Sequence, residues 1–542
     1  MRALIVALCL SLVLMVAAAT MRTTKAPREE ETMLERFFFK RLDGDHNGLV
    51  DRTELVRFAL TTDPPEEKTS ELQITIDTVT PIIALYDLNS DGVWDYDEFS
   101  SAFPQFAAPG SVLSEDPHQI RLQSTGVFSS MIVMWATSNN VSSVVNWGET
   151  AGLPFRTMGT TFTYHVPRWS GYLHTVTLTS LKPGTTYYYN CGDGGSPSEG
   201  GHTSSISSFT TEDLTLQSGR FAVVGDMGTV IPVGFKVAAK IADDHKVTPF
   251  DLVLHVGDLA YASVALPAPP AWTGWNAADS AQYGLLDPDV EGNGEWEFIW
   301  DMFCDQIEGI AAQVPYVAGV GNHEMFYNFS SYLHRFQNPP PWGYDPTHPN
   351  EVDHAKFWFS FSRNGIHFTF MSTEHPYDPS SPQYQWLEAD LAAARAANYS
   401  WIIMTGHRPM YCSDNDEWTA HEPGAPFQQQ IEPLMIKYGV DLYLSGHMHM
   451  MERVFPVQDG VPTQQQGHIY HNPGLPAHAV QGNSGVFTDH SYFVPTPMWS
   501  ATASPEFGYG QMEVFNATHL TYTYIGLDGN VMDYFTIVKD AS

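Results

Sequence analysis

The sequence predicts a multidomain protein with a small α-helical domain, then an all-β sandwich, then an α/β domain of two mixed sheets flanked by helices. Two loops with the ligand spacing of calcium sites begin at Asp43 and Asp87. Short strands separated by turn signals fill residues 131–210, and apolar β-rich runs that end in polar motifs follow. At 542 residues the chain is too long for one ordinary core, so we expect three folded domains.

The start of the chain predicts export. Arg2 precedes an apolar stretch, residues 3–16, that ends in a run of alanines, an order typical of a secretory signal peptide over residues 1–19. A membrane anchor is the alternative, but the stretch is shorter than the roughly 20 residues that span a bilayer. Four sequons are compatible with glycosylation in the same route, at Asn140, Asn328, Asn398 and Asn516. We expect a secreted, extracellular protein.

Charge and cysteine content limit the partners and the fold. The chain carries 26 Lys and Arg against 61 Asp and Glu, a net charge of -35, which would repel nucleic acid. We expect no membrane anchor after the signal peptide. The mature chain keeps Cys191, Cys304 and Cys412, too few for a disulfide-built fold, and Cys304 with Cys412 is the first pair to test. The oligomeric state has no signal in the sequence.

Residues 28–104 predict an EF-hand pair that binds calcium. Each loop has oxygen ligands at positions 1, 3, 5, 9 and 12 and glycine at position 6, as calcium coordination requires. The ligands are Asp43, Asp45, Asn47, Asp51 and Glu54 in the first loop and Asp87, Asn89, Asp91, Asp95 and Glu98 in the second. Val50 and Trp94 fall at position 8, where paired loops meet as a short β-bridge. Near-millimolar extracellular calcium would keep such sites filled, which favours a structural or docking role over switching.

A β-sandwich is predicted between this pair and the α/β domain. Evenly spaced short strands with turns between them, such as the one at Pro183-Gly184, favour that architecture. The expected strands are residues 131–135, 143–147, 172–181, 185–191 and 205–210.

Five polar motifs mark a catalytic site between Asp226 and His449. Ligands gather beyond the carboxyl ends of strands in an open α/β sheet, and four of the motifs follow an apolar β-rich run. Oxygen ligands and imidazoles suit Fe, Zn or Mn, and two such ions can clamp both sides of an in-line displacement. The motifs predict a two-metal phosphoesterase, and they are Gly225-Asp226-Met227-Gly228, Gly257-Asp258-Leu259-Ala260-Tyr261, Gly321-Asn322-His323-Glu324, Gly406-His407-Arg408 and Gly446-His447-Met448-His449.

This motif order resembles the calcineurin-like metallophosphoesterases. Tyr261, three residues after Asp258, makes the chain similar to the long-chain purple acid phosphatases of plants and animals, where a tyrosinate binds ferric iron. The stretches 357–372, 374–376, 383–391 and 406–411 carry the same resemblance, which covers roughly residues 115–540.

The resemblance implies a role for each motif residue. Asp226, Tyr261 and His449 would hold Fe(III). Asn322, His407 and His447 would hold a divalent ion, which is Zn, Fe or Mn. Asp258 would bridge the two ions, and His323 would face the substrate phosphate.

The resemblance also implies the architecture. A fibronectin-III-like domain at residues 113–212 would precede a catalytic domain at 217–542, and His174-Thr175-Val176 and Tyr187-Tyr188-Tyr189 are the most recognisable parts of the former. Helices are expected at 296–312, 383–397 and 427–438. Residues 510–515 and 520–525 are expected as edge strands.

One departure concerns protonation of the leaving group. Plant members place two histidines shortly after the motif of His407, but Asp416 and Glu417 stand there in this chain. His421 is the substitute catalytic candidate, and a solvent-facing loop histidine is the alternative interpretation. His323 and Glu422 are the other candidates for donating this proton.

The expected function is a secreted acid phosphatase that hydrolyses small phosphate monoesters by attack of a metal-bound hydroxide. One rival is a metallophosphodiesterase or nucleotide hydrolase of the same superfamily, which would share every ligand except Tyr261. The other is a calcium-dependent binding protein with an inactive phosphatase domain, which predicts a missing ligand. All seven ligand positions are filled here, which disfavours the second rival.

Overall fold

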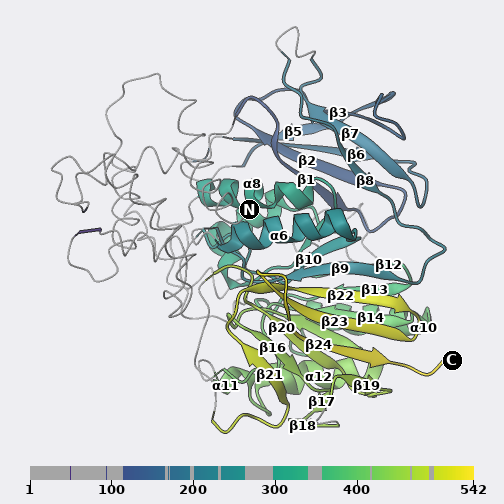
Figure 1. The fold of residues 1–542 in the computed structure, drawn as a ribbon, viewed down its shortest axis with the longest axis vertical. Coiled ribbons are helices and arrows are strands. Elements are labelled where there is room, and N and C mark those ends of the chain that lie inside the picture. The colour runs from purple at the N-terminus through teal and green to yellow at the C-terminus, as the bar shows by residue number, and fades with distance from the viewer. Residues whose placement is uncertain are drawn as a thin grey trace. The chain divides into compact units, whose positions relative to one another are not determined.

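The structure is a computed structural model (Figure 1). It describes residues 49–50, 93, 114–164, 169, 171–195, 201–229, 233–262, 297–339, 357–414, 418–463, 467–486 and 494–541. The chain divides into two compact units, Met1–Val112 and Leu113–Ser542. The predicted signal peptide and the helices and ligands of the predicted EF-hand pair lie outside the described residues. Val50 is described, and it is fully buried and takes part in a β-bridge.

The second unit begins with the predicted β-sandwich. One sheet has the order β1-β2-β6-β5 and the other β4-β3-β7-β8. Met131, Val133 and Trp135 alternate along β2 and pack in one core with Val145 and Tyr189 of the opposite sheet. All five predicted strands are present, while three more were missed. The bounds are β1 His118–Ser124, β2 Met131–Thr137, β3 Val144–Gly148, β4 Phe155–Met158, β5 Thr160–Phe162, β6 Tyr172–Leu178, β7 Thr186–Gly192 and β8 Ser207–Thr210.

Two seven-stranded mixed sheets build the α/β part, as predicted. The first has the order β11-β10-β9-β22-β23-β24-β19 and the second β12-β13-β14-β15-β20-β16-β21. The bounds in the first sheet are β9 Gly219–Val224, β10 Leu252–His255, β11 Tyr316–Ala318, β19 Ile469–His471, β22 Gly508–Asn516, β23 His519–Gly526 and β24 Val531–Val538. Those in the second are β12 Phe359–Arg363, β13 Ile366–Phe370, β14 Trp401–Thr405, β15 Leu442–Ser445, β16 Met451–Val454, β20 Ala477–Gln481 and β21 Ser500–Ser504. A short hairpin adds β17 Val457–Gln458 and β18 Val461–Pro462.

The two sheets pack face to face, with helices on their outer faces (Figure 1). Phe221 and Leu252 of the first sheet share an apolar core with Phe368 and Ile403 of the second. Helices α6 Val233–Val247 and α8 Glu297–Ala311 cover the first sheet, and α10 Pro382–Ala396 and α12 Pro426–Tyr438 cover the second. The shorter elements are η2 Asn322–Glu324, α9 Phe326–Arg335 and α11 Trp418–His421.

Local signals explain where the second pair of helices begins and ends. Ser381 accepts a hydrogen bond from the backbone N–H of Tyr384 and Pro382 follows it, so α10 starts with a side-chain cap and a proline in its first turn. Helix α12 ends at Gly439, which has a φ of 66°. The three helices predicted at 296–312, 383–397 and 427–438 are confirmed as α8, α10 and α12.

The expectation that residues 510–515 and 520–525 form edge strands is wrong. They belong to β22 and β23, which lie inside the first sheet, and β22 pairs antiparallel with β9. Strand β9 carries Asp226 at its carboxyl end. The hairpin of β22 and β23 therefore lies in the interior of the sheet that positions the site, not at an edge of that sheet.

A buried polar network joins the sandwich to the helices beside the site. Arg335, at the end of α9, pairs with Glu297 at 2.9 Å and Asp301 at 2.8 Å, and its Nε donates to the hydroxyl of Tyr164 at 2.7 Å. Arg121 of β1 donates to the carbonyl oxygen of Arg335. Buried charges are tolerated only when they are paired and hydrogen-bonded, so this network fixes α9 and the motif that precedes it against the sandwich.

None of the described helices is both long and apolar enough to cross a bilayer.

Candidate active site

The five motifs follow strands, as predicted. Asp226 follows β9 and Asp258 follows β10, while Asn322 follows β11. These three strands run parallel, so their motifs lie at one edge of the first sheet. His407 and His447 follow β14 and β15, which are parallel neighbours in the second sheet. The site therefore lies where the carboxyl ends of strands from both sheets meet.

The backbone is strained at four of the candidate ligands. The φ angles are 57° at Asp226, 52° at Asp258, 53° at Tyr261 and 69° at His447. A residue with a Cβ atom adopts this left-handed region at a cost, and such strain gathers at functional sites. The surrounding fold therefore holds these side chains where local preference would not put them.

Two candidate ligands, Asp226 and His449, converge on the hydroxyl of a third, Tyr261. This hydroxyl donates to Asp226 Oδ1 at 2.8 Å and lies 2.8 Å from His449 Nε2. His449 Nε2 is itself 3.6 Å from Asp226 Oδ1. Asp226 and Tyr261 are buried. A carboxylate, a phenol and an imidazole thus place their donor atoms around one point.

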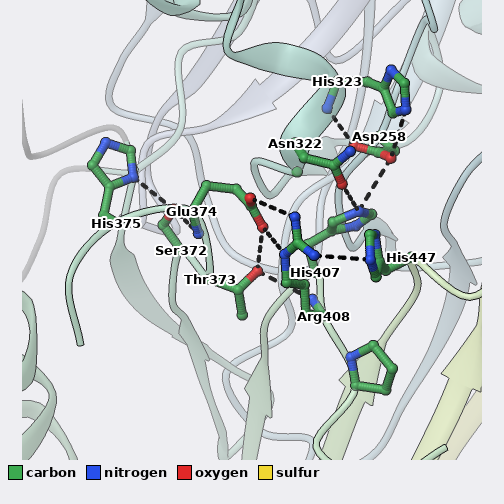
Figure 2. Close-up of polar contacts among 12 residues, drawn as sticks. Asp258, Asn322, His323, Ser372, Thr373, Glu374, His375, His407, Arg408 and His447 are labelled. Carbon is green, nitrogen blue, oxygen red and sulfur yellow. Dashed lines mark hydrogen bonds and ion pairs between the residues drawn. The ribbon is translucent and has the colours of Figure 1, made fainter. Parts of the chain in front are cut away.

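The remaining candidate ligands gather around Asp258 (Figure 2). His407 Nε2 lies 3.2 Å from Asp258 Oδ2 and 3.0 Å from Asn322 Oδ1. The ligand atoms of Asp258, His407 and His447 all lie within 4.8 Å of one another. The backbone N–H of His447 donates to Asp226 Oδ2 at 2.7 Å, which links this group to the first. The structure therefore brings the seven predicted ligands into one site.

The ionisable side chains of the site shift one another's pKa values strongly. Burial, then the charges of Asp226 and Asp258, raise the pKa of the Tyr261 phenol well above its usual range. Burial alone would raise the pKa of Asp258, but the charges of His407 and His323 hold it well below the usual range. Burial opposes the charged form of His407, yet Asp258 and Asp226 raise its pKa to about 9. A multivalent cation would reverse the pKa shifts of Tyr261 and His407, because it favours the ionised phenol and the neutral imidazole.

The donor set also matches the chemistry of iron, zinc and manganese. Carboxylate, phenolate and amide oxygens with imidazole nitrogens are the ligands that such ions take in proteins. The described residues therefore fit the pair of ions that the resemblance implies.

The motif glycines give the ligands room. A Cβ atom on Gly446 would lie 2.3 Å from Asp226 Oδ2, and one on Gly321 would lie 2.3 Å from Asp258 Oδ1. Each glycine therefore allows one loop to pass directly over the carboxylate of another.

Glu324 supports two of the loops, a role that the sequence did not predict. Its carboxylate accepts the backbone N–H groups of Asp258 at 2.8 Å, Leu259 at 2.8 Å and Gly321 at 2.7 Å. Its presence in the Asn-His-Glu motif was the available signal. Burial, then the charge of Asp258, raise the pKa of Glu324 to about 8.

His323 lies at the accessible side of the site. Its backbone N–H donates to Asp258 Oδ1 at 2.9 Å, and its side chain is 25% exposed. Its ring packs on Tyr261 with centroids 4.3 Å apart. This is where a residue that meets substrate should lie.

His421 is buried, so the alternative of a solvent-facing loop histidine is wrong. Its Nδ1 lies 2.7 Å from the carbonyl oxygen of Pro409, and its ring centroid is 6.2 Å from that of His447. Asp416 and Glu417, which stand where plant members have histidines, lie outside the described residues.

The three cysteines that the structure describes, Cys191, Cys304 and Cys412, are buried and free. Cys304 packs in the core under α8, and Cys412 packs with Met448, Met450 and Val480. The pairing of Cys304 with Cys412 is therefore not present, because the two side chains belong to different cores.

Family models match most of the second unit. Residues 117–211 match "Purple acid Phosphatase, N-terminal domain". Residues 219–451 match "Calcineurin-like phosphoesterase", and residues 475–534 match "Iron/zinc purple acid phosphatase-like protein C".

Similar proteins agree with these matches. "Acid phosphatase type 7" of Danio rerio is 32% identical over 466 residues, which is 79% of this chain and 92% of the relative. The protein of the same name in Homo sapiens is 33% identical over 451 residues, which is again 79% of this chain and 92% of the relative. A solved purple acid phosphatase from yellow lupin seeds superposes with a TM-score of 0.64 at 25% identity, over 78% of this chain and 75% of that one. The chain therefore belongs to the purple acid phosphatase family and is an enzyme of that type.

Proposed function

We propose that the enzyme hydrolyses small phosphate monoesters at a dinuclear Fe(III)–M(II) site, where M is Zn, Fe or Mn. The observation that supports this most is the hydroxyl of Tyr261, which lies 2.8 Å from both Asp226 and His449. In this proposal Asp226, Tyr261 and His449 hold the ferric ion, and Asp258 bridges the two ions. The divalent ion is held by Asn322, His407 and His447.

When bound, the two ions supply an activated water and neutralise the charge of the phosphate. The chain itself orients the donors. Glu324 fixes the loop that carries Asp258. The backbone N–H of His323 donates to the carboxylate of Asp258 and so restricts the rotation of that carboxylate. The partly exposed imidazole of His323 then stabilises negative charge that develops on the phosphoryl oxygens.

His421 is the proposed proton donor to the leaving group. A carbonyl oxygen only accepts, so the contact with Pro409 places a proton on Nδ1 of His421. A second proton, on Nε2, is then present only when the ring is cationic.

One series of assays tests both the proposed hydrolysis of phosphate monoesters and the proposed role of His421 as proton donor. Purified protein should hydrolyse p-nitrophenyl phosphate with a kcat/KM that exceeds that for bis(p-nitrophenyl) phosphate by roughly tenfold or more, a difference of about 1.4 kcal/mol. His421→Asn should lose much more activity on an alkyl phosphate than on p-nitrophenyl phosphate, because only the alkoxide needs a proton to leave. A preference for the diester would support a phosphodiesterase instead. Equal losses on both monoesters would remove His421 from the role.

The sequence supports further proposals for the rest of the chain. We propose a signal peptide at residues 1–19, an EF-hand pair at 28–104, a fibronectin-III-like domain at 113–212 and a catalytic domain at 217–542. Calcium would be held by the ten loop ligands named above, and the β-bridge at Val50, position 8 of the first loop, supports this. Export and glycosylation follow from the signal peptide and the sequons, of which Asn140, Asn398 and Asn516 are exposed.

Native mass spectrometry of protein recovered from the medium of eukaryotic cells tests these proposals together. The expected chain begins near Thr20, loses mass with a glycosidase, and carries two calcium ions that a chelator removes. Glu54→Gln and Glu98→Gln should each remove one calcium ion. An intact N-terminus at Met1 would contradict export, and a calcium-free chain would contradict the EF-hand pair.

A further inference from the structure

Arg408 connects a buried carboxylate to a candidate metal ligand (Figure 2). Its Nε donates to Glu374 Oε1 at 2.9 Å and its Nη2 to Glu374 Oε2 at 3.1 Å. Its Nη1 lies 3.0 Å from His447 Nε2. The side chain of Glu374 is fully buried, and that of Arg408 is 15% exposed. Glu374 thus anchors one edge of the guanidinium and places the other edge beside His447.

The contact between Arg408 and His447 uses a lone pair that a metal ion would also need. A guanidinium only donates hydrogen bonds, so Nε2 of His447 accepts this one. A neutral imidazole has a single nitrogen lone pair. An ion on Nε2 would displace Arg408 directly, and an ion on Nδ1 would put the proton on Nε2, where it would face another donor. Coordination by His447 and this contact therefore exclude each other.

We propose that Arg408 is a substrate-binding residue whose Nη1 edge passes from His447 to a phosphate oxygen when the divalent ion binds. The inference rests on the proposed function, because it takes His447 as a ligand of that ion. Glu374 holds Nε and Nη2, so the guanidinium would keep its counter-ion and its orientation while Nη1 exchanges one acceptor for the other. The planar fork of N–H groups matches phosphate oxygens, and a phosphate held beside His447 lies within reach of the donor that already contacts this ring.

The alternative is that Arg408 only supports His447 in an orientation suited to the metal. The two roles predict opposite changes in metal affinity. If Arg408 competes for the lone pair, its removal strengthens binding of the divalent ion, and loss of a neighbouring positive charge acts in the same direction. If Arg408 is a support, its removal weakens that binding.

The test uses Arg408→Met in the full-length protein with its iron in place. Zinc is titrated in a chelator buffer, and inorganic phosphate is the probe of the substrate site. We expect the dissociation constant of zinc to fall by about threefold or more. The inhibition constant of phosphate should rise roughly 10- to 100-fold, as expected for a lost charge-assisted hydrogen bond. The visible band of the iron should keep its intensity, because the hydroxyl of Tyr261 is hydrogen-bonded to Asp226 and His449 and the substitution leaves both in place.

Arg220→Met is the matched control. The side chain of Arg220 is 13% exposed and pairs with Glu513 at 3.7 Å, and it lies on β9 at the end away from Asp226. Neither the dissociation constant of zinc nor the inhibition constant of phosphate should change in this variant. Weaker zinc binding by Arg408→Met, or phosphate inhibition equal to that of the wild type, would overturn the inference. A wild-type protein that takes up both ions but is not inhibited by phosphate would contradict the proposed function, and the inference with it.

Discussion

Replacing Asp258 with asparagine is expected to reduce phosphatase activity by about a thousandfold or more, the equivalent of roughly 4 kcal/mol of transition-state stabilisation. Asp258 Oδ2 lies 3.2 Å from His407, and Oδ1 accepts the backbone N–H of His323 at 2.9 Å. A neutral amide offers one oxygen donor in place of two and removes a negative charge from between two cations. Metal analysis should therefore show loss of at least one ion together with the loss of kcat.

Asp390→Asn separates this effect from a general loss of stability. Asp390 is a buried carboxylate of α10, and it accepts hydrogen bonds from Ser360 at 2.6 Å and Thr369 at 2.8 Å. Its replacement should lower the melting temperature but leave the metal content unchanged. If Asp258→Asn kept both ions and its activity, Asp258 could not bridge them.

The positions of the candidate ligands could be predicted because each belongs to a short motif at the end of a strand. Glycine beside Asp226, Asp258 and His447 marks a tight turn, and the apolar run before it marks a buried strand. Parallel neighbours then bring these turns to one edge of a sheet. The local sequence, with the rule that ligands gather at the carboxyl ends of parallel strands, was sufficient to predict where these ligands lie.

The groups that support the ligands could not be predicted in the same way. Glu324 accepts backbone N–H groups from two loops, and Glu374 anchors Arg408 from a different segment. Such contacts depend on how loops far apart in the sequence meet, and they leave no fixed spacing between residues. The burial of His421 is a further case, because its polar neighbours in the sequence suggest an exposed loop.

The order of the strands within each sheet could not be predicted from the sequence either. The alternation in residues 510–515 and 520–525 predicts strands but does not say which strand they pair with. In the structure β22 pairs with β9, and β1, β4 and β5 add to the sandwich despite weak local patterns. Pairing between distant strands is decided by packing of the whole domain, which local propensity does not encode.

Tyr261→Phe is expected to abolish the visible colour of the protein while iron stays bound. Phenylalanine keeps the aromatic ring that packs on His323 at 4.3 Å but removes the hydroxyl that lies 2.8 Å from Asp226 and His449. A charge-transfer band between phenolate and Fe(III) needs that oxygen. Asp226 and His449 remain as ligands, so the iron should be retained.

Tyr332→Phe is the matched control. Tyr332 is also fully buried, and its hydroxyl donates to the carbonyl oxygen of Ala318 at 3.0 Å and accepts from Asn338 at 2.8 Å. Its replacement should leave the colour unchanged.

A visible absorption spectrum with metal analysis, taken on the wild type and on both variants, tests the dinuclear iron site most directly. The predicted result is a broad visible band in the wild type and in Tyr332→Phe, and iron without that band in Tyr261→Phe. A colourless wild-type protein that holds zinc or manganese but no iron would contradict the Fe(III)–M(II) site and favour a phosphodiesterase-like enzyme.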